Sequence, residues 1–269
     1  MESPIEMPKR PSLIPGVDLS KMPWWGILLI FAGLSISLLI LTDQNYNETF
    51  IFLKDGVVTT LRITFFAYIA ATILGLFTGL ARVSKNPFLF NISTLYVETV
   101  RGIPLVVLLL YIAFALVPLF IEGVLSLGID VSIRDVPMEL RAIIALAVGY
   151  GAYEGEVFRA GIQSIGKGQM EAARALGLSY FQAMRYVILP QAIRRVLPPL
   201  GNDFIALLKD SSLATVLAVN ELTQLGRLRR ASTFRVLETF NIMAFLYLAM
   251  TLFLSAVVRW LEEKMRIVE

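Results

Sequence analysis

Charged side chains interrupt stretches of this sequence that are otherwise apolar. Glu154 lies in one such stretch, and Asp203, Lys209 and Asp210 lie in another. A charge at the centre of a bilayer costs about 2.5–3.5 kcal/mol on insertion scales, so such residues mark pathways for polar solutes or form internal pairs. The chemistry that they favour is the recognition and passage of a polar or charged solute.

Glu154 is surrounded by small residues. Gly151 and Gly155 form a small-x-x-x-small pattern, which suits close contact between helices, as do Gly75 and Gly79 further back. A pathway carboxylate at Glu154 would favour a cationic solute by charge complementarity. A structural ion pair, for instance with Lys209 or Arg101, explains Glu154 equally well at this stage.

Two pairs of polar residues recur at a spacing of seven. Asp203 and Asp210 form one pair, and Asn202 and Lys209 form the other, with Ser211 adding a hydroxyl. Seven residues are close to two helical turns, so each pair falls on nearly one face. We expect a polar stripe that faces either the pathway or a partner subunit.

Arg101 stands beside a predicted helix break. Glu98 precedes it by three residues, on the same helix face, and Gly102 and Pro104 follow it. A structural Glu98–Arg101 pair is the simpler expectation. Binding of a solute carboxylate by Arg101 at an unwound segment is the alternative. Arg62, at the edge of an apolar stretch, is expected to extend its charge toward water.

Several kinds of chemistry are excluded by absent residues. The chain has no cysteine and no histidine. It therefore has no disulfide, no Cys/His zinc site and no histidine base for a catalytic triad. A carboxylate-only metal site or a Ser-Lys dyad stays open on composition alone, but no metal site is predicted. A P-loop fragment, Gly161–Lys167, is followed by Gly168 where a Ser or Thr would hold Mg²⁺, so it does not predict an ATP site in this chain.

The overall composition is that of a polytopic membrane protein. Hydrophobic residues make up 57% of the chain and charged residues 17%, whereas a soluble domain has roughly 25% charged residues. The net charge of +3 fits Lys and Arg in cytoplasmic loops better than binding of nucleic acid.

Six segments are long and apolar enough to predict an all-α bundle of six transmembrane spans. Four are free of charge and two contain the charges described above. The uninterrupted spans are Trp24–Leu41, Ile63–Ala81, Gly102–Ile121 and Thr239–Val258, and the interrupted ones are Arg141–Arg159 and Val196–Leu222.

Lysine and arginine set the expected orientation. They lie about twice as often in the segments on one side, which predicts that both termini are cytoplasmic. A proline-rich tail, residues 1–23, precedes the first span, residues 24–42. The cluster Arg227–Arg230 falls on the outer side, where a loop that folds back or a partner would explain it.

The long inner loop between the fourth and fifth spans predicts two short helices. The first is expected over Gln169–Leu176, with Glu171 in its first turn and Gly177 as its left-handed stop. Ser179 caps the second helix and forms a capping box with Gln182.

This loop has features that suit docking into a groove. Ala172 and Ala173 leave one flank small. The second helix is expected to end near Ile188, with Pro190 marking a kink or end and Pro198–Pro199 opening the next element. The alternative is an amphipathic loop that lies on lipid headgroups.

Several motifs resemble those of ATP-binding-cassette importer permeases, and more narrowly of polar amino-acid uptake permeases. The loop resembles their EAA loop. The matching stretches are Tyr96–Glu98, Arg101–Leu105, Ala152–Tyr153, Gly168–Gly177, Leu189–Ala192, Pro198–Asn202, Lys209–Leu213 and Glu221–Leu222.

The resemblance implies a type I permease domain over residues 57–260, with a five-span core and the first span as an addition. It implies a coupling loop at about residues 166–190 that docks on an ATP-binding-cassette ATPase dimer. The contacting residues would be Glu171, Ala172, Ala173, Gly177 and Pro190.

The resemblance also implies the other partners and the substrate. They are a second permease subunit, identical or paralogous, and an extracytoplasmic amino-acid-binding protein, in the bacterial inner membrane. The chain would hold no cofactor and catalyse no reaction, since ATP and Mg²⁺ would be on the ATPase. Glu156 matches an acidic position of the family, whereas Glu154 is additional, so we expect basic amino acids among the polar substrates.

Two other functions are weaker alternatives. A membrane-embedded enzyme would rest on Glu154 and Asp210 alone, without a histidine, cysteine or metal-like cluster. A secondary transporter would favour an inverted repeat, which we do not find, and would give the inner loop no role.

Overall fold

The computed structural model describes residues 24–265, and every regular element in that range is helical, which confirms the all-α prediction. The tail predicted over residues 1–23 lies outside the described residues. In chain order the elements are α1 (Trp24–Thr42), α2 (Gln44–Arg82), α3 (Pro87–Gly102), α4 (Leu105–Tyr111), the π-helical η2 (Ile112–Leu116), α5 (Val117–Ser126), the short η3 (Ile133–Asp135), α6 (Met138–Gln163), α7 (Lys167–Ala175), α8 (Tyr180–Ala183), the π-helical η4 (Met184–Ile188), α9 (Leu189–Asp210), η5 (Ser211–Leu217), α10 (Leu222–Thr233) and α11 (Val236–Met265).

Four helical segments are long and apolar enough to cross a membrane: α1, α2, the continuous run Leu105–Ser126 and α11. They correspond to the four charge-free windows of the sequence. The window Arg141–Arg159 lies within the long helix α6. The window Val196–Leu222 is not one helix, because α9 ends at Asp210, the 3₁₀ helix η5 follows and α10 begins at Leu222. The charges in both windows make them less apolar than the other four. The number of six spans therefore stays a prediction.

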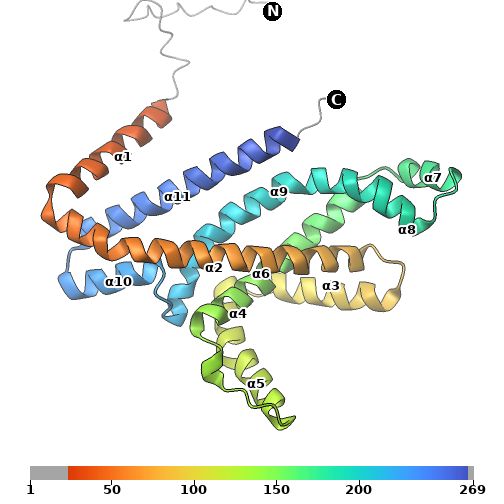
Figure 1. The fold of residues 1–269 in the computed structure, drawn as a ribbon, viewed down its shortest axis with the longest axis horizontal. Coiled ribbons are helices and arrows are strands. Elements are labelled where there is room, and N and C mark those ends of the chain that lie inside the picture. Colours follow the sequence, from red (N-terminus) through yellow and green to blue (C-terminus); the bar gives the residue numbers. More distant parts are fainter. Residues whose placement is uncertain (1–23, 266–269) are drawn as a thin grey trace, which may run out of the picture.

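The body is built on the contact between α2 and α6, the most extensive in the described chain (Figure 1). Glycines permit it. A Cβ atom on Gly75 would lie 2.7 Å from the Cβ of Glu154, and one on Gly79 would lie 2.5 Å from the Cβ of Phe158. The two predicted glycine motifs thus pack against each other in one seam.

α9 packs against both helices of the seam. The ring of Tyr68 stacks on Phe204 with centroids 4.4 Å apart, and its hydroxyl donates to the Leu200 carbonyl at 3.1 Å. These contacts join α2 and α9 close to Glu154. At one end of the body α10 contacts both α2 and α11, and α7 and α8 lie at the opposite end (Figure 1).

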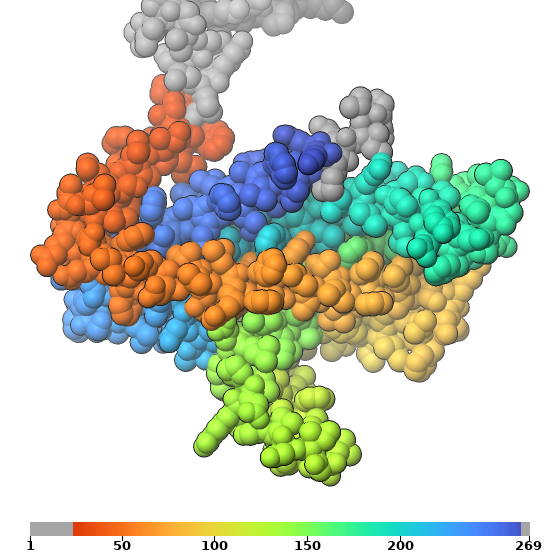
Figure 2. All heavy atoms as spheres, viewed as in Figure 1, coloured from red at the N-terminus to blue at the C-terminus, as the bar shows by residue number. Residues whose placement is uncertain are grey.

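Two apolar elements extend away from the body. α1 buries only Ile40, and the run from α4 to α5 projects outward as an arm (Figure 2). The base of the arm is held by Arg141, which is only 6% exposed and donates to the carbonyls of Ala113, Ile133 and Val136. A buried guanidinium satisfied by backbone carbonyls fixes where the arm leaves the body.

Three prolines do not interrupt the chain where the sequence predicted. α8, η4 and α9 follow one another without a gap, so Pro190 lies in the first turn of α9 and Pro198 and Pro199 lie inside that helix. The preceding π-helical turn uses wider i→i+5 bonding, which accommodates a residue that lacks an N–H near the start of α9. The expectation that Pro198–Pro199 opens a new element is wrong.

Candidate functional site

The α7–α8 loop forms a corner whose shape is set by its own backbone. Gly177 has φ +83°, its N–H donates to the Arg174 carbonyl at 3.0 Å, and the Leu178 N–H donates to the Ala173 carbonyl at 3.2 Å. These two bonds are the Schellman arrangement that ends a helix at glycine. The predicted stop at Gly177 is confirmed.

The predicted capping box after this corner is also present. The Gln182 N–H donates to the Ser179 hydroxyl at 3.2 Å, and the Ser179 N–H donates to the Gln182 side-chain oxygen at 2.8 Å. Each side chain satisfies a backbone donor that the helix leaves free. The corner is therefore a defined shape rather than an arbitrary loop.

The surface of this loop is unusual for a polar connection. Leu176 and Phe181 are 84% and 70% exposed, and Glu171 and Ala172 are exposed beside them. Ala173 is instead buried within the chain, so only one of the two alanines offers a small exposed flank. Large apolar groups displayed on an ordered corner are typical of a surface that another protein covers.

Glu171 lies further along its helix than predicted. α7 begins at Lys167, two residues earlier than expected, which places Glu171 beyond the first turn. Its proposed benefit from the helix dipole is therefore reduced, because that effect fades within the first turn. Its exposure leaves it free to contact another chain.

A second site is a polar and aromatic chain of contacts across three helices. The Arg101 guanidinium lies 5.3 Å from the ring centroid of Tyr153, whose ring lies 6.2 Å from that of Tyr150. The Tyr150 hydroxyl donates to Asp210 at 2.8 Å. Two predicted pathway residues, a cation on α3 and an anion at the end of α9, are thus linked through two tyrosines of α6.

The polar residues of α9 divide between two environments. Asn202 and Lys209 are exposed, whereas Asp203 and Asp210 are partly buried toward the body. Ser211 is buried and donates to the Leu208 carbonyl at 2.8 Å. Each seven-residue pair shares a face, as predicted, but the two pairs do not form one stripe.

Glu154 is fully buried, and neither carboxylate oxygen accepts a hydrogen bond within the described residues. Thr72 Oγ1 and Asp203 Oδ2 are also buried without a partner there. No ion pair of the described residues includes Glu154, and its suggested partner Lys209 is exposed. The structural ion pair proposed for Glu154 from sequence is therefore not formed in this conformation.

The expected Glu98–Arg101 pair is replaced by a longer-range one. Glu98 lies 3.5 Å from Arg82, which also contacts Glu156 at 2.6 Å. Glu156 in turn accepts from Arg159. The turn between α2 and α3 brings Arg82 close to Glu98 on α3 and Glu156 on α6. Arg101 contacts the ring of Tyr153 instead.

Sequence reasoning did not single out Tyr150 as a site residue, or Arg82 and Thr72 at all. A tyrosine pair three residues apart, at positions 150 and 153, is a helix-face signal that could have been read. The positions of Arg82 and Thr72 depend on how α2 packs on α6, which no local pattern shows. No group of acidic side chains in residues 24–265 has the arrangement of a metal site.

Sequence comparison places this architecture among transport proteins. Residues 71–267 match the family described as binding-protein-dependent transport system inner membrane component. The chain is 40% identical over 215 residues to the glutamine transport system permease protein of Escherichia coli (strain K12), covering 80% of this chain and 93% of that protein. It is 35% identical over 228 residues to the nopaline transport system permease protein of Agrobacterium fabrum, covering 83% and 93%.

Solved structures agree. A crystal structure of an amino acid ABC transporter with histidines matches at a TM-score of 0.68 with 36% identity, covering 84% of this chain and 98% of that one. An inward-facing structure of the MetNI methionine ABC transporter shares the fold at a TM-score of 0.64 with 20% identity, covering 80% and 97%. The chain belongs to the family of binding-protein-dependent transport system inner membrane components, the membrane permeases of ABC importers.

Proposed function

We propose that this permease passes polar L-amino acids, basic ones included, into the cytoplasm, driven by a separate ATPase. The observation that carries the coupling is the α7–α8 corner, which is ordered by its own backbone yet displays Leu176 and Phe181 to the outside. Relatives named for glutamine transport, and a solved amino acid ABC transporter with histidines, support amino acids as the substrate class.

The assembly follows from this assignment. The permease itself is not catalytic; an ATPase dimer that binds ATP and Mg²⁺ docks on Glu171, Ala172, Gly177 and the residues around them. A second permease subunit completes the pathway, and an extracytoplasmic binding protein delivers the amino acid. Both termini, and the α7–α8 loop, then lie on the cytoplasmic side.

The substrate pathway runs past the contacts between Arg101 and Asp210. The exposed guanidinium of Arg101 suits an amino-acid carboxylate. Asn202 and Lys209, on the exposed face of α9, and Ser211, buried just after that helix, are the other residues that we assign to the pathway. The opposite charges of Arg101 and Asp210, at the two ends of the tyrosine pair, complement the carboxylate and the ammonium of a zwitterionic amino acid that moves past them. Ala173, buried on α7, and Pro190, exposed in the first turn of α9, complete the residues that we assign to the coupling loop.

Coupling is tested by purifying the complex from native membranes through a tag at the C-terminus. We expect an ATPase subunit in about equimolar amount, and its loss with the Glu171→Lys variant, because reversing an exposed charge at the docking surface opposes a complementary partner. Lys85→Glu is the matched control, since Lys85 is an exposed charge on the short turn between α2 and α3.

Two results would contradict the assignment. One is retention of the ATPase, with normal uptake, by Glu171→Lys. The other is uptake that continues without any ATPase, which would support the secondary transporter instead. Loss of the ATPase from Lys85→Glu as well would show that any charge reversal at this end is harmful.

Substrate charge is tested at Glu154. A buried carboxylate without a partner is an electrostatic cost to the fold, and a passing cation would offset that cost. We expect Glu154→Gln to weaken uptake of arginine or lysine more than uptake of glutamine, while its thermal stability is retained or raised. Equal losses for all three amino acids would remove Glu154 from substrate selection.

A further inference from the structure

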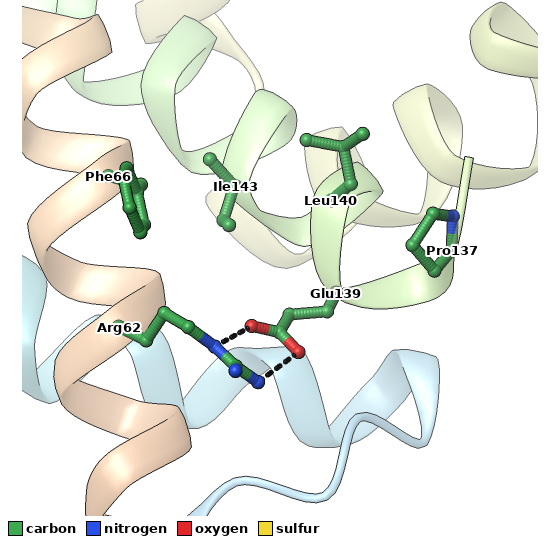
Figure 3. Close-up of a pocket in the computed structure, with 6 residues that line it drawn as sticks. All are labelled: Arg62, Phe66, Pro137, Glu139, Leu140 and Ile143. Atoms are coloured by element: carbon green, nitrogen blue, oxygen red, sulfur yellow. Dashed lines mark hydrogen bonds and ion pairs between the residues drawn. The ribbon is translucent and has the colours of Figure 1, made fainter. Parts of the chain in front are cut away.

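A shallow pocket lies between α2 and the start of α6 (Figure 3). Its cavity volume is about 340 Å³. The wall is apolar except for one ion pair, and the lining residues are Arg62, Phe66, Pro137, Glu139, Leu140 and Ile143. The pair is bidentate, with Nε and Nη2 of Arg62 donating to the two Glu139 oxygens at 2.5 and 2.7 Å.

The length of the charge-free part of α2 leads us to expect the ion pair at the level of lipid headgroups. Residues 63–81 of α2 carry no charge and extend for about 28 Å, which matches a hydrocarbon core of about 30 Å. Arg62 and Arg82 bracket this stretch. Arg62 therefore marks the boundary on the side opposite the α7–α8 loop, since α2 ends at Arg82 on the side of that loop (Figure 1).

The ion pair is not saturated. A guanidinium has five N–H donors, and Glu139 takes only two of those of Arg62, whose side chain is 51% exposed. A carboxylate has about four acceptor sites, of which Arg62 fills two, and the Glu139 side chain is 27% exposed. An adjacent anion and primary ammonium would complete both groups.

An apolar track continues from the pocket along α2. Phe66, Ile69, Ile73 and Phe77 are all exposed, and their spacing of three or four residues places them along one side of the helix. From Phe66 to Phe77 the track is about 16 Å long, which is half of the hydrocarbon thickness. Since Phe66 lies about 6 Å and Ile73 about 16 Å along the helix from Arg62, the part of the track from Phe66 to Ile73 corresponds to about one leaflet.

We propose that this pocket binds a phospholipid that carries a primary ammonium, of the phosphatidylethanolamine type. Its phosphate contacts the free N–H groups of Arg62, its ammonium donates to Glu139, and an acyl chain lies on the track from Phe66 to Ile73. The site is independent of the transported substrate and of the ATPase. It would hold α2 and the base of the α4–α5 arm at a fixed depth in the bilayer.

A zwitterionic lipid explains the site better than other occupants do. Binding of a second copy of the chain would not explain why an ion pair at headgroup depth keeps free donors and acceptors. A free amino acid would satisfy the charges but leave the apolar track unused. An anionic lipid would satisfy Arg62 and be repelled by Glu139.

The test is native mass spectrometry of the delipidated full-length permease, titrated with three lipids of identical acyl chains. The headgroups are ethanolamine, choline and glycerol. We expect the ethanolamine lipid to bind most tightly, because choline has no N–H to donate and glycerol carries no positive charge. Arg62→Gln should weaken its binding about tenfold, the effect of one lost charge-assisted contact.

Two further variants separate recognition from folding. Glu139→Gln should keep lipid binding but lose the preference for ethanolamine over glycerol. Arg227→Gln, at an exposed arginine on α10, should bind all three lipids as the wild type does. A change of selectivity without loss of binding is a result that misfolding would not produce.

Three outcomes would overturn the proposal. The first is equal binding of the three lipids in the wild type and in both pocket variants. The second is a dimer that forms without lipid and is lost in Arg62→Gln, which would assign the face to a second copy. The third is a bound free amino acid that Arg62→Gln removes.

Discussion

The α2–α6 seam and the α7–α8 loop both depend on glycine, but for different physical reasons. In the seam, a side chain on Gly75 or Gly79 would meet atoms of α6 at 2.5–2.7 Å. At Gly177 a Cβ would meet nothing within 4 Å, yet the backbone has φ +83°. The seam needs the absence of a side chain, whereas the loop needs a conformation that side chains disfavour.

This difference distinguishes residues that stabilise the fold of this chain from residues that are available to contact another chain. Residues of the seam are buried by their own chain, and their identity is explained by packing. The loop leaves Leu176 and Phe181 exposed, so the reason for those residues lies outside the chain. Substitutions in the two regions should therefore fail in different ways.

Gly79→Leu should have the largest effect on stability. The new side chain would have to displace the backbone of Gly155 and Arg159 as well as the Cβ of Phe158, none of which can rotate away. Overpacking costs about 1–3 kcal/mol where a core adapts, and more where it does not. We expect little folded protein, with a greatly lowered Tm in detergent.

Gly123→Leu is the control for this prediction, because a Cβ at Gly123 on α5 meets nothing within 4 Å. It introduces the same side chain into a helix that has open space beside it. If both variants unfold at the same temperature, the seam is not what holds α2 to α6.

Much of this comparison could be predicted from local sequence. The capping box at Ser179, the stop at Gly177 and the paired glycine motifs depend on neighbours within about four residues, and all three are present. The charge-free windows depend only on composition, and they match the four long apolar helices. The continuity of α9 through Pro190 was not predictable from such rules, since it depends on a π-helical turn.

The candidate pathway was less predictable, because its contacts join distant residues. Tyr150 and Asp210 are 60 positions apart, and Arg82 and Glu156 are 74 apart. Sequence spacing identified which residues are polar within spans, but Glu98 was assigned to its near neighbour Arg101. In the structure Glu98 pairs with Arg82 instead, because helix packing brings these two residues together.

Helix caps offer a second contrast, with an intermediate effect. Glu221 is fully buried and accepts from the N–H groups of Thr223 and Gln224 and from the Tyr247 hydroxyl, so it joins α10 to α11. Ser179 caps α8 at the exposed corner. Glu221→Ala removes the acceptor of one buried and two partly buried donors, of which the Tyr247 hydroxyl keeps its contact with Thr223 Oγ1 at 2.9 Å. Each donor left unsatisfied costs about 1–3 kcal/mol.

Ser179→Ala loses one exposed cap, and water can replace the lost hydrogen bond. We expect a clear fall in Tm for Glu221→Ala and a change of less than about 1 kcal/mol in global stability for Ser179→Ala, at the low end for caps. Thermal unfolding of the two purified variants under identical conditions makes the measurement. A larger loss for Ser179→Ala would mean that the loop contributes to the body as much as the buried caps do.

Gly177→Pro should change stability least and function most. Proline fixes φ near −65° and removes the N–H that donates to Arg174, so the corner at Gly177 becomes inaccessible. The loop lies at the end of the body and can rearrange locally while the seam stays intact, so Tm should move little. ATP-driven uptake should fall by about tenfold or more, because the docked shape is reached only at a cost of at least ~1.4 kcal/mol.

Gly177→Asn is the matched variant, since asparagine tolerates the left-handed conformation and should keep most of the activity. Wild-type uptake by the proline variant would show that the corner does not transmit coupling, whereas equal loss in both variants would place the requirement on the missing side chain rather than on the backbone.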